Sequence, residues 1–208
     1  LPLRGARVLP WTPETERRAP PNPTLPGRLD GVLHSSPEYV PTGQRRVMSR
    51  RTPTNGGERS ASATTVAPAP GAADDNDMWR VKGPDGTPTD HRASQSVAHG
   101  DIIRLEHVLT ARNLHSHAGH PSPVTGQQEV TCFGEGGIGD GNDNWRVEVD
   151  GSGVWSAHSR VRLIHESTNH ALHSHPGLSH PVWTAGQQEV TGFAGRDDND
   201  WWWLLEVR

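Results

Sequence analysis

The stretch that decides the fold occurs twice in this chain. It is NLHSHAGHPSPVTGQQEVTCF at 113–133, and it returns as ALHSHPGLSHPVWTAGQQEVTGF at 171–193. The LHSH blocks begin at Leu114 and Leu172, 58 positions apart. Two further blocks flank both copies in the same order: RLEH at 104–107 and RLIH at 162–165, then GNDNWRVEV at 141–149 and DNDWWWLLEV at 198–207. Four blocks at one spacing indicate an internal repeat.

A third copy, altered in sequence, precedes these two. Its recognisable blocks are GVLHSS at 31–36, TGQRRV at 42–47 and DDNDMWRV at 74–81. Between them, and at the N-terminus, the chain is rich in Pro, Arg, Ser, Thr and Ala. Such a composition buries too little apolar surface to offset the entropy lost on ordering. We therefore predict a disordered tail over 1–27 and a low-complexity insert over 48–71.

Each block alternates as a β-strand does. Ile103 and Leu105 share one face of DIIRLEHV, and TARN at 110–113 is typical of a turn. Four strands in each of three copies, with about 55 residues per copy, predict an all-β fold, a β-trefoil. Such a fold is a six-stranded barrel capped by three hairpins.

The repeat also predicts the domain organisation. One trefoil domain covers 28–208 and contains a degenerate first repeat over 28–100, a second repeat over 101–158 and a third repeat over 159–208. The residues expected in its core recur at equivalent positions: Trp79, Leu105, Leu114, Val130, Trp145, Leu163, Leu172 and Val190. The WWW run at 201–203 leaves open which tryptophan of the third repeat is equivalent to Trp145.

Composition excludes several classes of protein. The formal net charge is −4, which offers no basic surface of the kind that binds nucleic acid. No apolar run approaches the roughly 18 residues of a membrane span. Cys132 is the single cysteine, so no disulfide forms within the chain.

The motifs GDIIRLEHVLTARNLHSH at 100–117 and PVTGQQEVTCFGEGGIGDGNDNWRVEV at 123–149 resemble those of MIR domains, and so does the second set from 161 to 193. MIR domains are β-trefoil modules of protein O-mannosyltransferases, of inositol trisphosphate and ryanodine receptors, and of the stromal cell-derived factor two family. The resemblance covers about 74–208. Ala111 stands where the family usually has glycine.

The resemblance implies a non-catalytic recognition module that binds a glycan or an unfolded or mannosylated polypeptide. It implies a location in the endoplasmic reticulum lumen or secretion, with a chaperone or a mannosyltransferase as protein partner. One alternative is a lumenal MIR segment of a membrane protein O-mannosyltransferase. A second alternative is a decaying module without function.

The repeated polar residues predict a ligand-binding surface. His-x-His on a strand places both rings on one face, and amide side chains suit hydroxyl-rich ligands. We expect the leucines of LHSH to face the core and the histidines to lie on the opposite, exposed side. The predicted ligand-contacting residues are His115, His117, Gln127, Glu129, His173, His175, Gln187, Glu189 and the loop residue Trp183. The alternative is that these side chains recur because the fold recurs, with a glutamine capping a neighbouring hairpin.

Neither catalysis nor a cofactor is predicted. The acidic runs GDGNDN at 139–144 and RDDND at 196–200 lie beside Gly and Asn, which is typical of turns. No Ser-His-Asp order, phosphate loop or acid–base pair stands out. A metal is not predicted either, because the histidines have no evident third or fourth ligand beside them.

Overall fold

The computed structural model describes most of the two well-preserved copies and parts of the N-terminal region. The described ranges are 6–10, 32–39, 45–50, 78–88, 95–156, 159–174 and 188–207. The remainder of the predicted tail and insert lies outside the described residues.

The described chain is built from strands, and this confirms the all-β prediction. Thirteen strands form one sheet. They are β1 (Ala6–Pro10), β2 (Val32–Tyr39), β3 (Arg45–Arg50), β4 (Trp79–Lys82), β5 (Ile102–His107), β6 (Arg112–Pro121), β7 (Gln128–Phe133), β8 (Trp145–Val149), β9 (Arg160–His165), β10 (Ala171–His173), β11 (Gln188–Glu189), β12 (Thr191–Phe193) and β13 (Trp202–Val207). Two short 3₁₀ turns, η2 (Gly141–Asp143) and η4 (Asp198–Asp200), precede β8 and β13.

Six strands close into a ring. The antiparallel pairings run from β1 to β4, β5, β8, β9 and β13, and β13 pairs again with β1. Hairpins β2–β3, β6–β7 and β10–β12 contact one another through β3–β7, β7–β12 and β3–β11. This closed, barrel-like sheet fits a β-trefoil-like fold. Closure leaves no edge strand in the ring to pair with another molecule.

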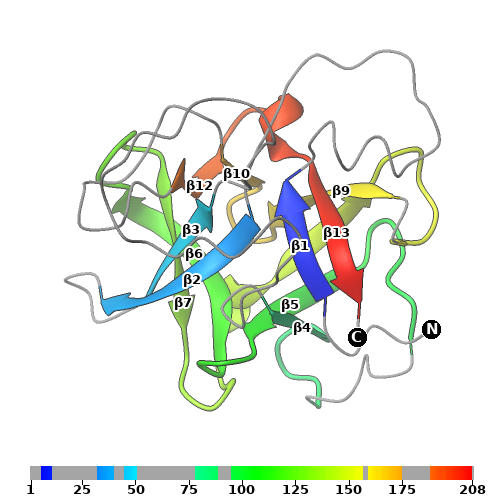
Figure 1. The fold of residues 1–208 in the computed structure, drawn as a ribbon, viewed down its shortest axis with the longest axis horizontal. Helices are drawn as coiled ribbons and strands as arrows, with labels where there is room; N and C mark the ends of the chain where they lie inside the picture. The colour runs from blue at the N-terminus through cyan, green and yellow to red at the C-terminus, as the bar shows by residue number, and fades with distance from the viewer. Residues whose placement is uncertain are drawn as a thin grey trace, which may run out of the picture.

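The N-terminal strand completes the ring, and here the structure differs from the sequence prediction. Strand β1 lies beside the C-terminal strand β13, with Pro10 opposite Trp202 (Figure 1). The corresponding partners elsewhere are Trp79 with His107 and Trp145 with His165. The predicted disordered tail is therefore wrong for β1, whose residues satisfy the backbone groups of β13. The predicted insert over 48–71 likewise begins too early, because β3 extends to Arg50.

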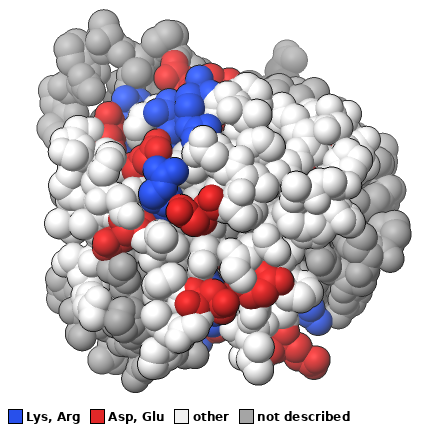
Figure 2. Space-filling model, turned by 180° about the vertical axis from the view of Figure 1, so that it is seen from behind, with Lys and Arg blue, Asp and Glu red and all other residues white. Residues whose placement is uncertain are grey.

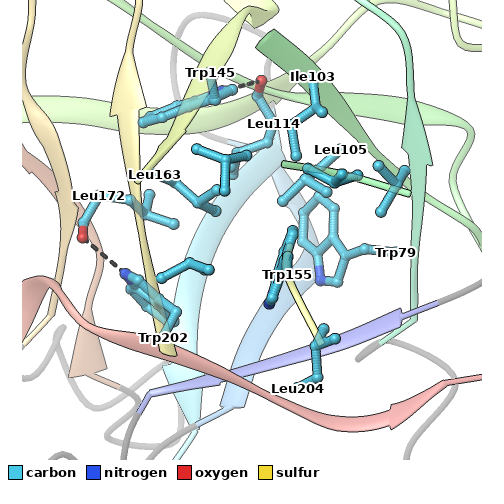
Figure 3. Close-up of a cluster of buried hydrophobic side chains, with 14 of the residues drawn as sticks. Trp79, Ile103, Leu105, Leu114, Trp145, Trp155, Leu163, Leu172, Trp202 and Leu204 are labelled. Carbon is cyan, nitrogen blue, oxygen red and sulfur yellow. Dashed lines mark hydrogen bonds between the residues drawn. The ribbon is translucent and has the colours of Figure 1, made fainter. Parts of the chain in front are cut away.

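The ring encloses the hydrophobic core (Figure 3). All eight residues expected there are buried, with exposed fractions from 0% to 2%. Trp155 joins them, although no repeated block contains it. Its backbone N–H donates to Val97 O at 2.8 Å, which holds this non-repeated segment against the core.

One turn carries a backbone conformation that its residue disfavours. Ala111, between β5 and β6, has a φ of 49°. In this left-handed region the Cβ of an L-residue crowds the following carbonyl, which costs about 1–2 kcal/mol. This conformation explains why glycine suits the position in related sequences.

Candidate functional site

The LHSH strand separates its side chains as alternation predicts, but its outer face is covered. Leu114 and Ser116 pair with Cys132 and Val130 of β7. Leu114 is fully buried, yet His115 on the opposite face is also only 2% exposed. The turn η2 lies over β6 and buries the histidine ring.

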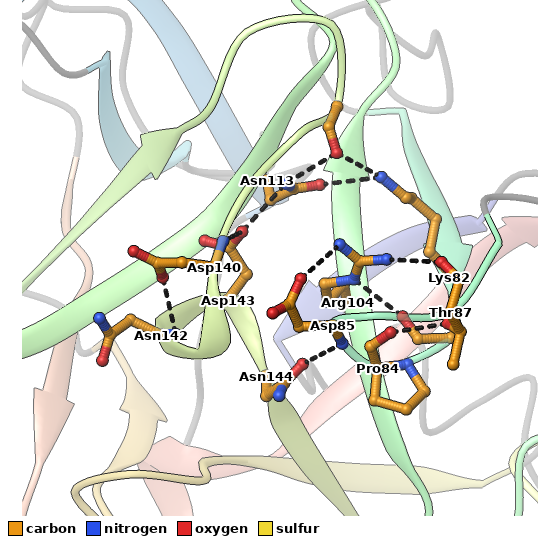
Figure 4. A network of polar contacts seen from close by, with 12 residues as sticks. Lys82, Pro84, Asp85, Thr87, Arg104, Asn113, Asp140, Asn142, Asp143 and Asn144 are labelled. Atoms are coloured by element: carbon orange, nitrogen blue, oxygen red, sulfur yellow. Dashed lines mark hydrogen bonds and ion pairs between the residues drawn. The ribbon is translucent and has the colours of Figure 1, made fainter.

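A buried carboxylate holds that ring. His115 Nδ1 lies 2.8 Å from Asp143 Oδ1. The other oxygen of Asp143 accepts hydrogen bonds from Asn113 Nδ2 and from the backbone N–H of Asp140, both at 3.0 Å (Figure 4). Asp140 in turn accepts from Asn142 N at 2.8 Å, which completes a capping box around η2. Three donors thus satisfy a carboxylate that has no exposed surface, as a buried charge requires.

Close backbone approach is needed for this arrangement. A Cβ built on Gly139 would overlap Asp143 Oδ2 and crowd Asn113 Nδ2. Glycine is therefore the residue that lets the loop pass over the carboxylate.

The third repeat, 159–208, contains the same contacts. His173 Nδ1 lies 2.8 Å from Asp200 Oδ1, and Asp197 caps η4. The rings of His115 and His173 pack on Phe133 and Phe193, each with centroids 4.7 Å apart. Two histidine–aspartate clasps therefore tie the LHSH strands to the turns that follow, and we use this name for His115–Asp143 and His173–Asp200.

The tryptophan after each 3₁₀ turn fastens the same strand from the core side. Trp145 Nε1 donates to Leu114 O at 3.0 Å, and Trp202 Nε1 donates to Leu172 O at 2.8 Å (Figure 3). Trp202 is therefore the equivalent of Trp145. Trp201 instead lies against two cations, with the guanidinium carbons of Arg162 and Arg160 at 4.0 and 4.7 Å from its ring centroid.

The residue types of the clasps are those that bind metals. His115 with Asp140 and Asp143, and His173 with Asp197 and Asp200, each place their ligand atoms within 4.8 Å of one another. However, a carboxylate only accepts, so the histidine Nδ1 that faces it carries the proton. The carboxylates also accept backbone N–H groups of the turn. A metal would have to displace these bonds, so we assign both groups a structural role.

The GQQEVT blocks connect one copy to the next. Thr191 Oγ1 of the third repeat donates to Gln127 Oε1 of the second repeat at 2.5 Å. Gln128 Nε2 lies 2.6 Å from Ser116 Oγ and 3.0 Å from Thr168 Oγ1. These contacts join hairpin β6–β7 to β12 and to the turn after β9.

The glutamate of the second GQQEVT block also spans the copies. Glu189 Oε1 accepts from Ser122 Oγ and from the backbone N–H of Val124, the latter at 3.1 Å. The side chain is buried at 3% exposure. Its other oxygen, Oε2, has no hydrogen-bond partner among the described residues. Glu189 therefore caps the loop of the preceding hairpin, whereas the structural alternative assigned such a cap to a glutamine of this motif.

His165 forms a third connection. Its Nε2 donates to Asn142 O at 3.0 Å, and its Nδ1 accepts from Thr168 Oγ1 at 2.7 Å. Burial lowers the pKa of His165 below 6.5, and the Asn142 carbonyl only partly opposes this effect. The ring is thus held neutral, with its proton on Nε2.

A buried lysine links β4 to the second repeat, 101–158 (Figure 4). Lys82 Nζ donates to Glu106 Oε2 at 3.0 Å, Asn113 Oδ1 at 3.3 Å and Gly137 O at 2.7 Å. All three of its donors are used, and the side chain is 1% exposed. Asn113 thereby bridges this lysine to the clasp carboxylate Asp143.

The structure divides the predicted ligand-contacting residues into three groups. His115, His173 and Glu189 are buried and hydrogen-bonded, so the expectation that they lie on an exposed face is wrong. His117, Gln127 and Glu129 are partly exposed on hairpin β6–β7. Three others, His175, Trp183 and Gln187, lie outside the described residues.

Sequence reasoning missed the carboxylates that cover the histidines. The turns containing Asp143 and Asp200 were predicted as turns alone. A signal was present, because each LHSH block is followed after a nearly constant interval by the pattern Asp-x-x-Asp. The alternation of β6 specifies which face a histidine occupies but not which distant turn packs on it.

Comparison with known proteins places this architecture in a family. The sequence matches the MIR domain over residues 32–205. The chain belongs to the MIR domain family. It is 37% identical over 162 residues to a stromal cell-derived factor 2-like protein of Arabidopsis thaliana, covering 77% of this chain and 71% of that protein. It is 40% identical over 166 residues to protein O-mannosyl-transferase 2 of Drosophila pseudoobscura pseudoobscura, covering 77% of this chain and 20% of the transferase.

A solved structure agrees with this assignment. The crystal structure of the SDF2-like protein from Arabidopsis thaliana superposes with a TM-score of 0.72 at 30% identity, covering 97% of this chain and 92% of that one. In the part of the MIR chain that is described, no helix has the length and apolar character that crossing a membrane requires.

Proposed function

We propose that this MIR-family chain is a non-catalytic recognition module that binds a glycan or an unfolded or mannosylated polypeptide. The observation that carries the proposal is the division of its repeated polar residues. The clasps and the inter-copy contacts bury His115, His173 and Glu189, whereas His117, Glu129 and Gln127, which bonds Thr191 through Oε1, remain partly exposed along one hairpin. Amide, carboxylate and imidazole groups on one strand pair suit a ligand rich in hydroxyl or peptide groups.

The placement of the carboxylates favours recognition over catalysis. Asp140 and Asp197 accept the backbone N–H groups of their own turns, and Asp143 and Asp200 hold histidine rings. An acid–base pair needs carboxyl groups directed at a bound substrate. Asp143 and Asp200 are fully buried, and Asp140 and Asp197 cap the turns beside them, so the four groups are bonded within the fold.

The domain that presents this surface is proposed to consist of three four-strand units, with β1–β4 as the interrupted first unit. The equivalent partners Trp79–His107, Trp145–His165 and Trp202–Pro10 support this organisation. Hairpin β2–β3 contacts β7 and β11, so the first unit supports the hairpin that carries the proposed surface.

The surface charge is compatible with a neutral ligand. Figure 2 shows acidic and basic side chains interspersed on one face of the molecule, with much of that face carrying neither. Such a mixture gives little long-range attraction for a polyanion. This mixture and the formal net charge of −4 favour a glycan or an extended polypeptide over a nucleic acid.

The alternative is that the chain is a lumenal segment of a protein O-mannosyltransferase, as its 40% identity to one-fifth of the Drosophila transferase suggests. In both cases the module itself binds and does not catalyse. Its relatives support a location in the endoplasmic reticulum lumen or secretion, with a chaperone or a mannosyltransferase as partner. The neighbouring transcript distinguishes the two, because apolar spans of about 20 residues on either side would indicate the membrane enzyme.

A glycan and peptide array probed with the purified chain tests the proposal. The double variant His117→Ala with Glu129→Ala should abolish binding to the ligand that the array identifies, while its melting temperature stays within a few degrees of the unaltered chain. Exposed substitutions usually change stability by about 0.5 kcal/mol or less. The matched control is His170→Ala with Glu166→Ala, on the β9–β10 turn. An array without any bound glycan or peptide, or unchanged binding by the double variant, would refute the proposed function.

A further inference from the structure

Hairpin β6–β7 contains a bulge that places two histidines together. The strands pair regularly up to Ser116 with Val130, but the next pair is Pro121 with Gln128. Five steps along β6 therefore match two steps along β7, and the extra residues are expelled from the ladder. Gly119 within this segment has a φ of 87°, a conformation that glycine adopts without strain.

The bulge directs His120 back toward His117. Their ring centroids are 4.0 Å apart, with the planes at 67°. The ring of His115 lies on the other side of His117, at 5.2 Å between centroids. His117 is partly exposed and His120 is exposed, so both imidazoles are accessible from solvent.

The ring of His117 is in the form that binds metals. Its Nδ1 lies 3.3 Å from Ala118 O. A carbonyl only accepts, so Nδ1 carries the proton and Nε2 presents a lone pair. A backbone carbonyl that orients the far nitrogen is a usual feature of histidines that ligate metals.

A carboxylate lies beside the pair. Asp140 is within electrostatic reach of His117 and its side chain is 48% exposed. Its Oδ1 serves the η2 cap and lies 3.8 Å from His115 Nδ1. This negative charge favours a cation near the two rings, although Asp140 does not form a compact three-ligand group with His117 and His120.

We propose that His117 and His120 bind a divalent transition-metal ion of the Zn²⁺ or Cu²⁺ type, with the Asp140 carboxylate beside them. Imidazole nitrogens suit these ions, and a carboxylate oxygen is also an accepted ligand of Zn²⁺. Water fills the remaining coordination positions. The site differs from the histidine–aspartate clasps, where the carboxylates and Nδ1 atoms already satisfy one another.

Calorimetric titration of the full chain with ZnCl₂ at pH 7.5 tests the site. No glycan or peptide is present, so the result does not depend on the proposed recognition function. His117→Ala and His120→Ala should each weaken Zn²⁺ binding by at least about tenfold, since loss of even an outer-shell partner costs 10–100-fold. The matched control His170→Ala, a partly exposed histidine on another turn, should leave the affinity and stoichiometry unchanged.

A second measurement keeps the test valid if a variant unfolds. In the unaltered chain with ¹⁵N-labelled histidine, Zn²⁺ should shift the ring-nitrogen resonances of His117 and His120 at one equivalent. Resonances of these two rings that stay unchanged at saturating Zn²⁺, or shifts confined to His115 and His173, would overturn the proposal. Wild-type affinity in both alanine variants would overturn it as well.

Discussion

Replacement of Trp202 tests its assignment as the tryptophan of the third repeat that is equivalent to Trp145. Trp202 has no exposed surface and donates through Nε1 to Leu172 O at 2.8 Å. Truncation of a large core aromatic costs about 3–5 kcal/mol, so Trp202→Ala should lower the free energy of unfolding by that amount. Trp202→Phe keeps an aromatic ring but leaves a buried carbonyl without its donor, and should cost about 1–3 kcal/mol.

The matched control is the neighbouring Trp201. It is partly exposed and is held by the guanidinium groups of Arg162 and Arg160 at 4.0 and 4.7 Å. Exposed cation–π contacts contribute about 0.5–1 kcal/mol each, so loss of both in Trp201→Ala should cost about 1–2 kcal/mol. Trp145→Ala should match Trp202→Ala, because Trp145 makes the equivalent bond to Leu114 O.

Urea unfolding followed by far-ultraviolet circular dichroism measures these differences, because that signal does not depend on the tryptophans that are changed. Domains of this kind have about 5–15 kcal/mol of stability, so a loss of 3–5 kcal/mol gives a large shift of the midpoint. The reasoning fails if Trp201→Ala costs as much as Trp202→Ala, or if Trp202→Ala costs less than about 1 kcal/mol.

Three further predictions concern the clasp, the neutral histidines and the strained turn. Asp143→Ala should lower the free energy of unfolding, measured in urea, by about 2–4 kcal/mol because it leaves buried donors unpaired. The cap variant Asp140→Ala should lower it by about 1 kcal/mol. Equal losses in the two variants would contradict the clasp. Because the pKa of His165 is lowered in the fold, the unfolded chain binds more protons below pH 6.5, so the urea midpoint should fall as the pH drops through 6.5. His165→Gln should reduce the dependence of this midpoint on pH. A midpoint that stays constant or rises on acidification would contradict the prediction. Ala111→Gly should raise the free energy of unfolding by about 0.5–1 kcal/mol, the relief of the left-handed strain less the added entropy of glycine, and a lower melting temperature would contradict the strain.

The repeat in the sequence was sufficient to predict most of the core. Leu114 and Leu172 recur within identical blocks, and an apolar residue that returns at the same place in two copies occupies the same place in the fold. Alternation then assigned the buried face of each strand, since side chains on a strand point to opposite sides in turn. The strands and the buried tryptophans Trp79 and Trp145 follow from these two patterns.

Local composition did not predict the strands whose pairing partners lie far away in the sequence. Strand β1 reads as part of a Pro- and Arg-rich tail, yet it pairs with β13 at the other end of the chain. Its order comes from backbone groups that β13 leaves unsatisfied, and no window of local sequence contains that information. The same holds for the end of β3, which pairs with β11.

The sequence alone determined the repeat, the strand periods and the family, because these depend on spacing and on the residues themselves. Only the tertiary structure decided which polar residues remain accessible. His115 and His117 lie on the same face of one strand, but Asp143, 28 positions after His115, folds over the first ring and leaves the second partly exposed. The period of a strand specifies the direction of a side chain, whereas its burial depends on a turn brought there by the closure of the whole sheet.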